Sequence, residues 1–247
     1  MALYDFSAPR LFVDRPLQDG IPVELDRSQS NYLLNVLRLS AGRSILAFNG
    51  QDGEWRASIA ATGRKSASLV PAEQLRPQPA APDLVYMFAP LKHARTDYMV
   101  QKAVEMGAGR LQPVFTRRTI AARVNRERMR ANAIEAAEQC GILVVPDIGP
   151  EEDLGTALNR LPERCLLVFG DEEAPVGNPV DALRGADRSA GCAVLVGPEG
   201  GFDPDERAAL LARDNVKRIS LGPRILRADT AAVAALAIVQ ASFGDWG

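Results

Sequence analysis

The stretch Cys192-Ala-Val-Leu-Val-Gly-Pro-Glu-Gly-Gly-Phe-Asp-Pro-Asp-Glu206 reads as a buried strand, a glycine-rich loop and the start of a helix. Its first five residues are all apolar, as in a short strand buried on both faces of a parallel sheet. Asp203 precedes Pro204 and stands three residues before Glu206, which predicts an N-cap, a proline at the first helical position and a capping box. Strand, loop and helix in this order form the repeating unit of an α/β fold.

The same alternation continues on both sides of this stretch. Sequence patterns predict strands at 84–89, 111–116, 142–145, 165–169 and 216–221, and helices at 95–106, 126–139 and 228–243. We therefore expect residues 84–247 to form a mostly parallel sheet with helices on both faces.

Residues 1–72 have a different pattern. Short strand-like runs occur at 10–13, 44–48, 54–59 and 67–70. One helical stretch at 28–39 would place Leu33, Leu34, Val36 and Leu37 on one side. These features favour a small β-barrel with one inserted helix. Residues 73–83 hold three prolines in eleven residues, which predicts a stiff linker and a domain boundary.

Composition excludes several classes of protein. The chain has 247 residues, of which 47% are hydrophobic and 24% charged, as in ordinary globular domains. Its longest apolar run, 231–239, is too short to span a membrane. Met1–Phe6 lacks the basic and apolar regions of a signal peptide, so we expect no signal peptide. Three widely spaced cysteines predict buried thiols in a reducing cytoplasm and no metal site.

Charge is segregated along a chain whose net charge is −2. Residues 92–130 contain ten Lys or Arg against three Asp or Glu, a net of +7. Residues 131–174 contain two Arg against ten Asp or Glu, a net of −8. A basic face could therefore meet phosphates while the molecule as a whole stays acidic.

Common catalytic motifs are absent from the sequence. It has no dinucleotide fingerprint after the first strand of the α/β region, no phosphate loop for nucleoside triphosphates and no G-x-S-x-G motif. Its one histidine, His93, would have to serve any histidine-dependent catalysis, and we expect it to have no catalytic role.

Two glycine-marked loops follow predicted strands, at 195–202 and 219–230. Ligands of open α/β sheets bind outside the carboxyl ends of the strands, where such loops lie. Glycine permits positive φ and close backbone approach to a ligand. A Gly-Pro pair alone is more readily a tight turn than a binding site, but two such loops that each lead into a helix favour a binding site.

These loops carry a family resemblance. Val196-Gly-Pro-Glu-Gly-Gly-Phe202 and Leu221-Gly-Pro-Arg-Ile-Leu-Arg227 resemble the signature of the RsmE family, which are ribosomal RNA methyltransferases of the SPOUT class. Arg10-Leu-Phe-Val13 and Val36-Leu-Arg-Leu39 resemble the family's N-terminal PUA-like domain. Glu135-Ala-Ala-Glu-Gln-Cys-Gly141 resembles its middle helix. The chain differs from the family pattern at Tyr32, Ile142 and Ala228-Asp229.

The resemblance implies an activity, a fold and partners. The activity is transfer of a methyl group from S-adenosylmethionine to N3 of a uridine in small-subunit (16S) ribosomal RNA. The fold is a SPOUT-type trefoil-knotted parallel sheet over 84–247, after a PUA-like RNA-binding β-barrel over 1–72. The partners are that RNA, or the ribonucleoprotein particle that contains it, and a second copy of the chain in a homodimer.

The resemblance and the loops together assign the cofactor-binding residues. They are Phe169, Gly170, Val196, Gly197, Pro198, Glu199, Gly200, Gly201, Ser220, Leu221, Gly222, Ile225, Leu226 and Thr230. Transfer to a uracil nitrogen also needs a group that stabilises the uracil anion and a route for the proton. Arg227 is the first candidate for the stabilising group and Arg224 the second, and Asp229 could accept the proton. The alternatives are a helix-end contact or a dimer salt bridge for the arginines, and a helix cap for Asp229.

RNA contacts are expected from basic residues of the barrel and of the basic region. The candidates are Arg10, Arg38, Lys92, Arg95, Lys102, Arg117 and Arg118. Phosphate contacts of this kind position RNA without reading its sequence. For each residue a solvated surface role is an equal alternative.

Two other functions compete with methyl transfer. A non-catalytic RNA-binding assembly factor would use the barrel and the basic region and would have an inactive cofactor site. The intact glycines of both loops argue against it. A small-molecule α/β enzyme with a nucleotide cofactor is disfavoured by the missing dinucleotide fingerprint and by the added barrel.

Overall fold

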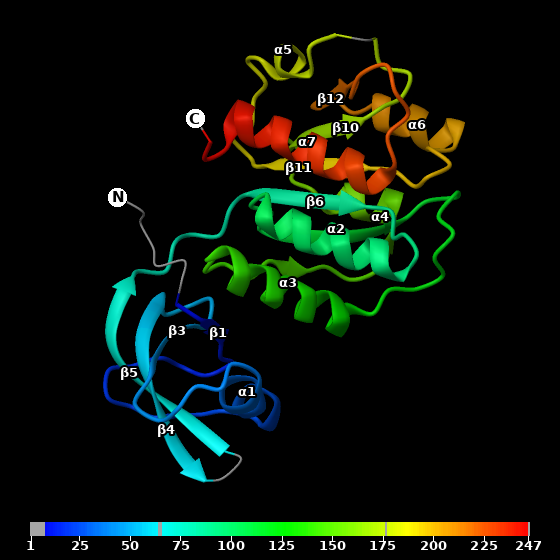
Figure 1. The fold of residues 1–247 in the computed structure, drawn as a ribbon. Helices are drawn as coiled ribbons and strands as arrows, with labels where there is room; N and C mark the ends of the chain where they lie inside the picture. The colour runs from blue at the N-terminus through cyan, green and yellow to red at the C-terminus, as the bar shows by residue number, and fades with distance from the viewer. Residues whose placement is uncertain (1–7, 64–65, 176, 247) are drawn as a thin grey trace. The chain divides into compact units, whose positions relative to one another are not determined.

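A computed structural model describes residues 8–63, 66–175 and 177–246. Met1–Phe6 and the side chain of His93 lie outside this description, so the expectations about them stay predictions. The chain divides into two compact units. The first consists of Met1–Ala80 and Ile134–Val145, and the second of Ala81–Ala133 and Pro146–Gly247. Figure 1 shows the elements of both.

The first unit contains a five-stranded sheet with strand order β1-β3-β4-β5-β2. The β1–β3 pair is parallel and the other pairs are antiparallel. Its core includes the fully buried Leu33, Ile45 and Leu69. The strands are β1 (Arg10–Phe12), β2 (Val23–Glu24), β3 (Ser44–Phe48), β4 (Glu54–Gly63) and β5 (Ser66–Arg76).

Strand β5 is longer than predicted and enters the segment expected to be a linker. Glu73 and Gln74 still pair with Arg56 and Trp55 of β4, and the ladder continues to Arg76. The three linker prolines all come after this strand, where they interrupt no ladder. The predicted domain boundaries themselves stay predictions.

The inserted helix of the first unit differs from a regular α-helix. Helix α1 (Arg27–Asn31) starts with a capping box between Asp26 and Gln29, and a π-helical turn η1 (Tyr32–Val36) follows. The wider π-turn rotates the later side chains within it away from their α-helical positions. Leu33 is therefore fully buried while Val36 is 60% exposed. The prediction that Val36 shares the apolar side is wrong.

The second unit is built on a seven-stranded sheet. Its main path has the order β12-β10-β11-β6-β7-β8, with β9 paired to β7. Every pair is parallel, as expected from the alternating pattern. The strands are β6 (Leu84–Phe88), β7 (Arg110–Phe115), β8 (Asp147–Ile148), β9 (Glu152–Asp153), β10 (Leu166–Gly170), β11 (Cys192–Val196) and β12 (Val216–Ile219).

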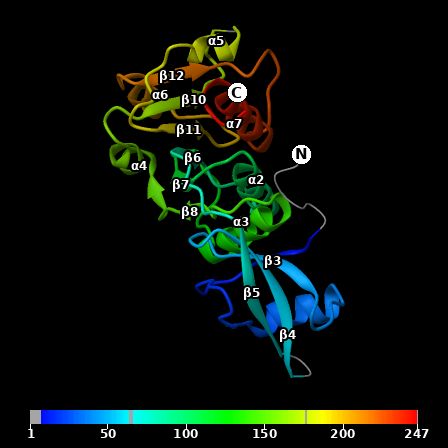
Figure 2. The same ribbon diagram turned by 90° about the vertical axis from the view of Figure 1, so that its left-hand side faces the viewer.

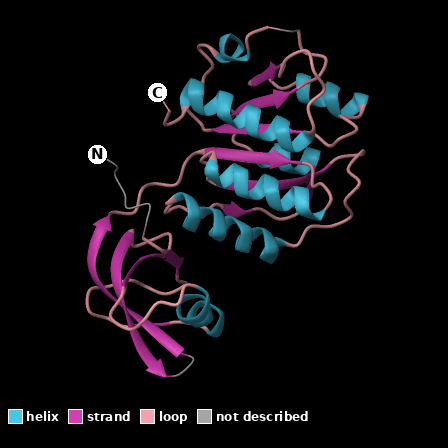
Figure 3. Cartoon of the chain, in the orientation of Figure 1, coloured by secondary structure: helices cyan, strands magenta, loops and turns pink. Residues whose placement is uncertain are grey.

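Helices cover both faces of this sheet, as Figures 2 and 3 show. α2 and α7 pack on one face. α4 and α6 lie on the other, over a core that includes Met87, Leu167 and Leu195. The capping box at Asp203 and the limits of α7 agree with the predictions. The helices are α2 (His93–Glu105), α3 (Arg126–Cys140), α4 (Leu154–Arg160), α5 (Pro179–Leu183), α6 (Pro204–Leu211) and α7 (Ala228–Phe243).

Two sequence predictions about residues 134–145, which belong to the first unit, are wrong. Residues 142–145 form no strand: the Ile142 N–H donates to the Ala137 carbonyl at the end of α3 (3.0 Å), and the Leu143 carbonyl accepts a hydrogen bond from the Gln78 side chain (3.3 Å). The strand comes later, as β8. Cys140 is exposed, unlike the buried Cys165 and Cys192, so only two of the three thiols are buried. Among the described residues no helix is long and apolar enough to cross a membrane.

Candidate functional site

Three neighbouring strands of the second unit end around one cavity of about 530 Å³. β12, β10 and β11 are adjacent and parallel, so the loops after them leave the same edge of the sheet. We call residues 197–202 the first glycine loop and residues 220–227 the second glycine loop. Both line the cavity, together with residues 169–173 after β10. The carboxyl edge of a parallel sheet is where α/β proteins bind ligands.

The cavity brings together nearly all of the residues that the sequence assigns to the cofactor. Thr230 does not line it and is exposed on the first turn of α7. Ile225 lines it at its rim and is 92% exposed as a residue. The lining also contains residues that sequence reasoning missed, namely Asp171, Glu172, Glu173, Phe202, Arg207, Ile219, Pro223, Ala228 and Ala231. Asp171 had a usable signal, since it directly follows a buried strand.

Glycine is required at several points of the two loops. A Cβ on Gly197 would lie 2.6 Å from the ring of Phe202, which packs edge-on against Phe169. Gly201 has φ +68° and its N–H donates to the Pro198 carbonyl (2.9 Å), which closes a tight turn. Gly222 has φ +98°. A side chain at Gly197 would clash with Phe202. At Gly201 and Gly222 the positive φ is a conformation that residues with a side chain rarely adopt.

The catalytic candidates lie around the start of α7. Arg224 and Arg227 line the cavity with exposed side chains, and Arg227 occupies the N-cap position without a side-chain capping bond. Asp229 lies in the first turn of α7 and does not line the cavity. Its carboxylate accepts a hydrogen bond from the Thr230 N–H (2.8 Å), which is a local helix-start contact.

Arg95 joins the first glycine loop to the start of α7. Its guanidinium pairs with Glu199, and its Nε lies 3.8 Å from a carboxylate oxygen of Asp229. Beneath α2 and α7, burial raises the pKa of the Tyr86 hydroxyl, and the negative charge of Asp229 raises this pKa further. Among the described residues the Tyr86 hydroxyl has no hydrogen-bond partner. Through its pairs with Glu199 and Asp229, Arg95 contacts the candidate site itself, a role that sequence reasoning missed.

Of the other predicted RNA contacts, two are exposed residues and three bind groups of the second unit. Arg38 and Lys92 are exposed. Lys102 pairs with Glu105 of its own helix, Arg117 pairs with Asp203 and Asp205, and Arg118 donates to the Gly200 carbonyl (2.8 Å). Arg117 and Arg118 thus hold the first glycine loop and the helix after it.

Arg10 is a correction to the predicted RNA surface. Its side chain is 3% exposed, and its Nε donates to the buried carboxylate of Glu54 at 3.0 Å. Arg76 donates to the same carboxylate at 2.7 and 2.8 Å. A guanidinium enclosed in this way cannot reach an RNA phosphate in the described conformation, so we remove Arg10 from the RNA contacts.

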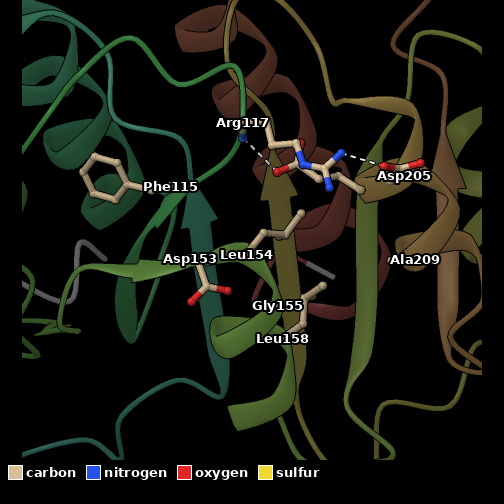
Figure 4. Close-up of a pocket in the computed structure, with 9 residues that line it drawn as sticks. Phe115, Arg117, Asp153, Leu154, Gly155, Leu158, Asp205 and Ala209 are labelled. Atoms are coloured by element: carbon tan, nitrogen blue, oxygen red, sulfur yellow. Dashed lines mark hydrogen bonds and ion pairs between the residues drawn. The ribbon is translucent and has the colours of Figure 1, made fainter.

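A second cavity, of about 370 Å³, lies between β7, α4 and α6. Figure 4 shows its lining, with Arg117 at one side and Leu154 and Leu158 at another. Its charged groups already have partners: Arg117 pairs with Asp205, and Asp153 caps α4 through the Thr156 N–H. Among the described residues no cluster of His, Cys, Asp or Glu could hold a metal ion. The cavity between the glycine loops is therefore the candidate site.

A parallel sheet with glycine loops at neighbouring strand ends, joined to a separate β unit, fits an RNA methyltransferase. A family model described as an RNA methyltransferase domain matches residues 78–240, and one described as an RNA methyltransferase PUA domain matches residues 25–72. Ribosomal RNA small subunit methyltransferase E of Rickettsia conorii is 31% identical over 94% of this chain and 94% of that protein. The chain belongs to this ribosomal RNA small subunit methyltransferase E family.

Solved structures agree with this assignment. The methyltransferase E of Neisseria gonorrhoeae, bound to S-adenosyl methionine, has a TM-score of 0.84 and 26% identity, over 97% of this chain and 100% of that one. A methyltransferase of Legionella pneumophila in complex with the same cofactor has a TM-score of 0.79 and 26% identity, over 95% of this chain and 98% of that one.

Proposed function

We propose that this protein transfers a methyl group from S-adenosylmethionine to N3 of a uridine in 16S ribosomal RNA. The observation that carries the proposal is the cavity between the two glycine loops, in a chain of the methyltransferase E family. When bound, S-adenosylmethionine supplies an electrophilic methyl group. The name of the relatives supports small-subunit ribosomal RNA as the substrate, and the bound cofactor of two solved neighbours supports S-adenosylmethionine.

The residues that line the cavity fit this cofactor. Its volume of about 530 Å³ lies within the range of sites for drug-sized ligands. A Cβ on Gly201 or Gly222 would meet no atom within 4 Å, so the backbone there is open to a ligand. Phe169, Val196 and Leu221 supply apolar walls, and the backbone of the loops supplies hydrogen-bonding groups.

The chemistry at N3 assigns roles to three side chains. The uracil N3 loses a proton as the new N–C bond forms, and negative charge develops on the uracil carbonyl oxygens. Arg227 and Arg224 line the cavity; we propose that Arg227 stabilises that charge, with Arg224 as the second candidate. We propose Asp229 as the proton acceptor, directly or through water. Its carboxylate does not line the cavity, but it lies in the first turn of α7, two residues after Arg227, and near Arg95, which also pairs with the first glycine loop.

RNA would bind over the basic side chains of the second unit. We call Lys92, Arg95, Arg117 and Arg118 the four basic-segment residues. Three of them also contact the first glycine loop, the N-cap residue of α6 or α6 itself. Arg38 of the first unit and Lys102 complete the proposed set. The RNA is presented as free 16S RNA or within its ribonucleoprotein particle, and single-stranded or looped RNA would expose the uracil edge.

Three further properties belong to this proposal. The chain forms a homodimer, which sedimentation can check. Its second unit carries the trefoil knot of SPOUT enzymes, for which the strand order β12-β10-β11-β6-β7 gives support. The protein works in the cytoplasm, because its proposed substrate is ribosomal RNA.

The test is methylation by the purified protein. Labelled S-adenosylmethionine is incubated with unmodified 16S RNA and, separately, with small-subunit particles, and the digested nucleosides are identified by mass spectrometry. We expect 3-methyluridine as the only labelled nucleoside. Label in another nucleoside would refute the N3 assignment. No label, and no cofactor binding by calorimetry, would instead favour the non-catalytic assembly factor.

A further inference from the structure

A buried carboxylate lies next to the candidate cofactor site. Asp171 directly follows β10 and lines the cavity, yet its side chain is only 4% exposed. Arg207 binds it with a two-pronged contact, from Nε to one oxygen at 3.1 Å and from a terminal nitrogen to the other at 2.9 Å. Arg218 adds a contact at 3.4 Å. A charge this enclosed is tolerable only with such partners.

The three residues belong to three segments that lead into or out of the cavity loops. Asp171 opens the segment after β10. Arg207 lies in α6, which begins just after the first glycine loop. Arg218 lies in β12, two residues before the second glycine loop begins at Ser220. One carboxylate therefore connects all three segments that surround the proposed cofactor.

Backbone contacts make the connection more rigid. The Asp171 N–H donates to the Ile219 carbonyl (3.2 Å), at the last residue of β12. The Glu173 N–H donates to the Asp171 carboxylate (3.1 Å), and Arg207 also pairs with Glu173 at 3.0 Å. The planar guanidinium of Arg207 fixes both distance and orientation, which a lysine could not do.

We propose that Asp171 is a positioning residue for cofactor binding. By holding α6 and β12 together it sets the spacing of the two glycine loops, and it acts through Arg207 and Arg218. This inference rests on the proposed function, because it takes S-adenosylmethionine to be the occupant of the cavity. It predicts that loss of the carboxylate weakens cofactor binding while RNA binding and the chemical step stay nearly unchanged.

The first test is Asp171→Asn, which keeps the shape of the side chain and removes its charge. Hydrogen bonds to charged groups contribute enough that the Kd for S-adenosylmethionine should rise about tenfold in calorimetry. The Kd for RNA should stay within about twofold, and kcat at saturating cofactor should fall much less than the KM for the cofactor rises. If Asp171 only supported folding, its loss would not weaken cofactor binding while leaving RNA affinity and kcat nearly unchanged.

A second pair of variants keeps the test valid if Asp171→Asn does not fold. Replacing Arg218, whose side chain is 34% exposed, leaves the buried Asp171 carboxylate still paired with Arg207, so it creates no unpaired buried charge. We expect Arg218→Gln to weaken cofactor binding several-fold and Arg218→Lys to recover part of that loss. Asp187→Asn is the matched control, since it breaks the exposed Arg164–Asp187 pair of the same unit and should leave cofactor affinity unchanged.

The results separate this inference from the proposed function. Folded Asp171→Asn and Arg218→Gln proteins with cofactor affinity within about twofold of wild type would overturn the inference alone. An equal loss of cofactor and RNA affinity, with a lower Tm, would also overturn it. Failure of the wild-type protein to bind S-adenosylmethionine would overturn the proposed function and this inference with it.

Discussion

Replacing Gly201 with alanine tests whether the first glycine loop must keep its left-handed backbone to bind the cofactor. Gly201 has φ +68° in a turn closed by the hydrogen bond from its N–H to the Pro198 carbonyl. An added Cβ would meet no atom within 4 Å. The substitution therefore adds backbone strain without a clash. For an L-residue this strain is about 1–2 kcal/mol.

Because the space around Gly201 is open, the strain can appear as weaker cofactor binding or as lost stability of the free protein. Without cofactor, the loop of Gly201→Ala can relax to another conformation. Binding must then restore the original one at the same cost. A cost of about 1–2 kcal/mol corresponds to a roughly 5- to 30-fold rise in the Kd for S-adenosylmethionine, measured by calorimetry. Thermal melts of the same samples show how much of the strain appears as lost stability instead.

Gly185 provides a matched control for this prediction. It has φ +71°, an added Cβ would also meet no atom within 4 Å, and it does not line the cavity. Gly185→Ala should therefore lose a similar amount of stability or less, with unchanged cofactor affinity. The reasoning fails if Gly201→Ala binds S-adenosylmethionine within about twofold of wild type, or if Gly185→Ala weakens binding equally.

Three further predictions concern catalysis, RNA binding and acid stability. Arg227→Ala should lower the single-turnover rate on the order of 10²-fold, by analogy with loss of one oxyanion donor, and Arg227→Lys should recover part of it. A stable Arg227→Ala protein with a near wild-type rate would contradict the catalytic role. Changing the four basic-segment residues to alanine should reduce the slope of log affinity for RNA against log salt by roughly 0.9 per lost contact at a duplex-like site, and an unchanged slope would place the RNA elsewhere. Burial raises the pKa of Glu54, but hydrogen bonds from Arg76 and Arg10 outweigh this effect and leave the pKa below its ordinary value of 4.5. The stability that Glu54 contributes is therefore present above its unfolded-state pKa and is lost as the pH falls through the folded-state pKa. Glu54→Gln should lower the free energy of unfolding at neutral pH by roughly 3 kcal/mol, because it leaves Arg10 buried with weakened pairing, and should flatten the acid dependence of that free energy. If the free energy of unfolding of wild type and of Glu54→Gln changed with pH in the same way, the result would contradict the pairing of Glu54 with Arg10 and Arg76.

Local sequence signals predicted the framework of the second unit well. The Asp203, Pro204 and Glu206 pattern located the start of α6, because a capping box involves only neighbouring residues. The apolar run with Asp229 in its first turn gave the limits of α7. The two glycine loops pointed to the cavity, since parallel strands bring their carboxyl ends to one edge.

Contacts between distant residues could not be read in the same way. Arg95, Arg118 and Asp171 contact the cavity loops through partners 36 to 134 residues away. Charge counts assigned the two arginines to RNA, but they could not show that the same side chains also contact the cavity loops, because a sequence does not show which carboxylates or carbonyls will be adjacent. The predicted RNA contact of Arg10 had to be removed because its partner Glu54 lies on a different strand, which the sequence does not show to be adjacent.

Irregular backbone was the other limit. The π-turn over 32–36 has no clear residue signature, so a regular helical period placed Val36 on the wrong side. At 142–145 the apolar pattern correctly indicated burial of Leu143 but could not show that its carbonyl bonds to a side chain instead of a strand. Apolar periodicity reports burial more reliably than it reports the hydrogen-bond partners of the backbone.

The central claim is methylation of uridine N3 in 16S ribosomal RNA by this chain. Nucleoside mass spectrometry of 16S RNA from a strain that lacks the gene, before and after complementation, tests it most directly. We predict that 3-methyluridine is missing from the deletion strain, returns with the wild-type gene and does not return with an Arg227→Ala gene. A deletion strain with an undiminished level of 3-methyluridine in its 16S RNA would contradict the claim.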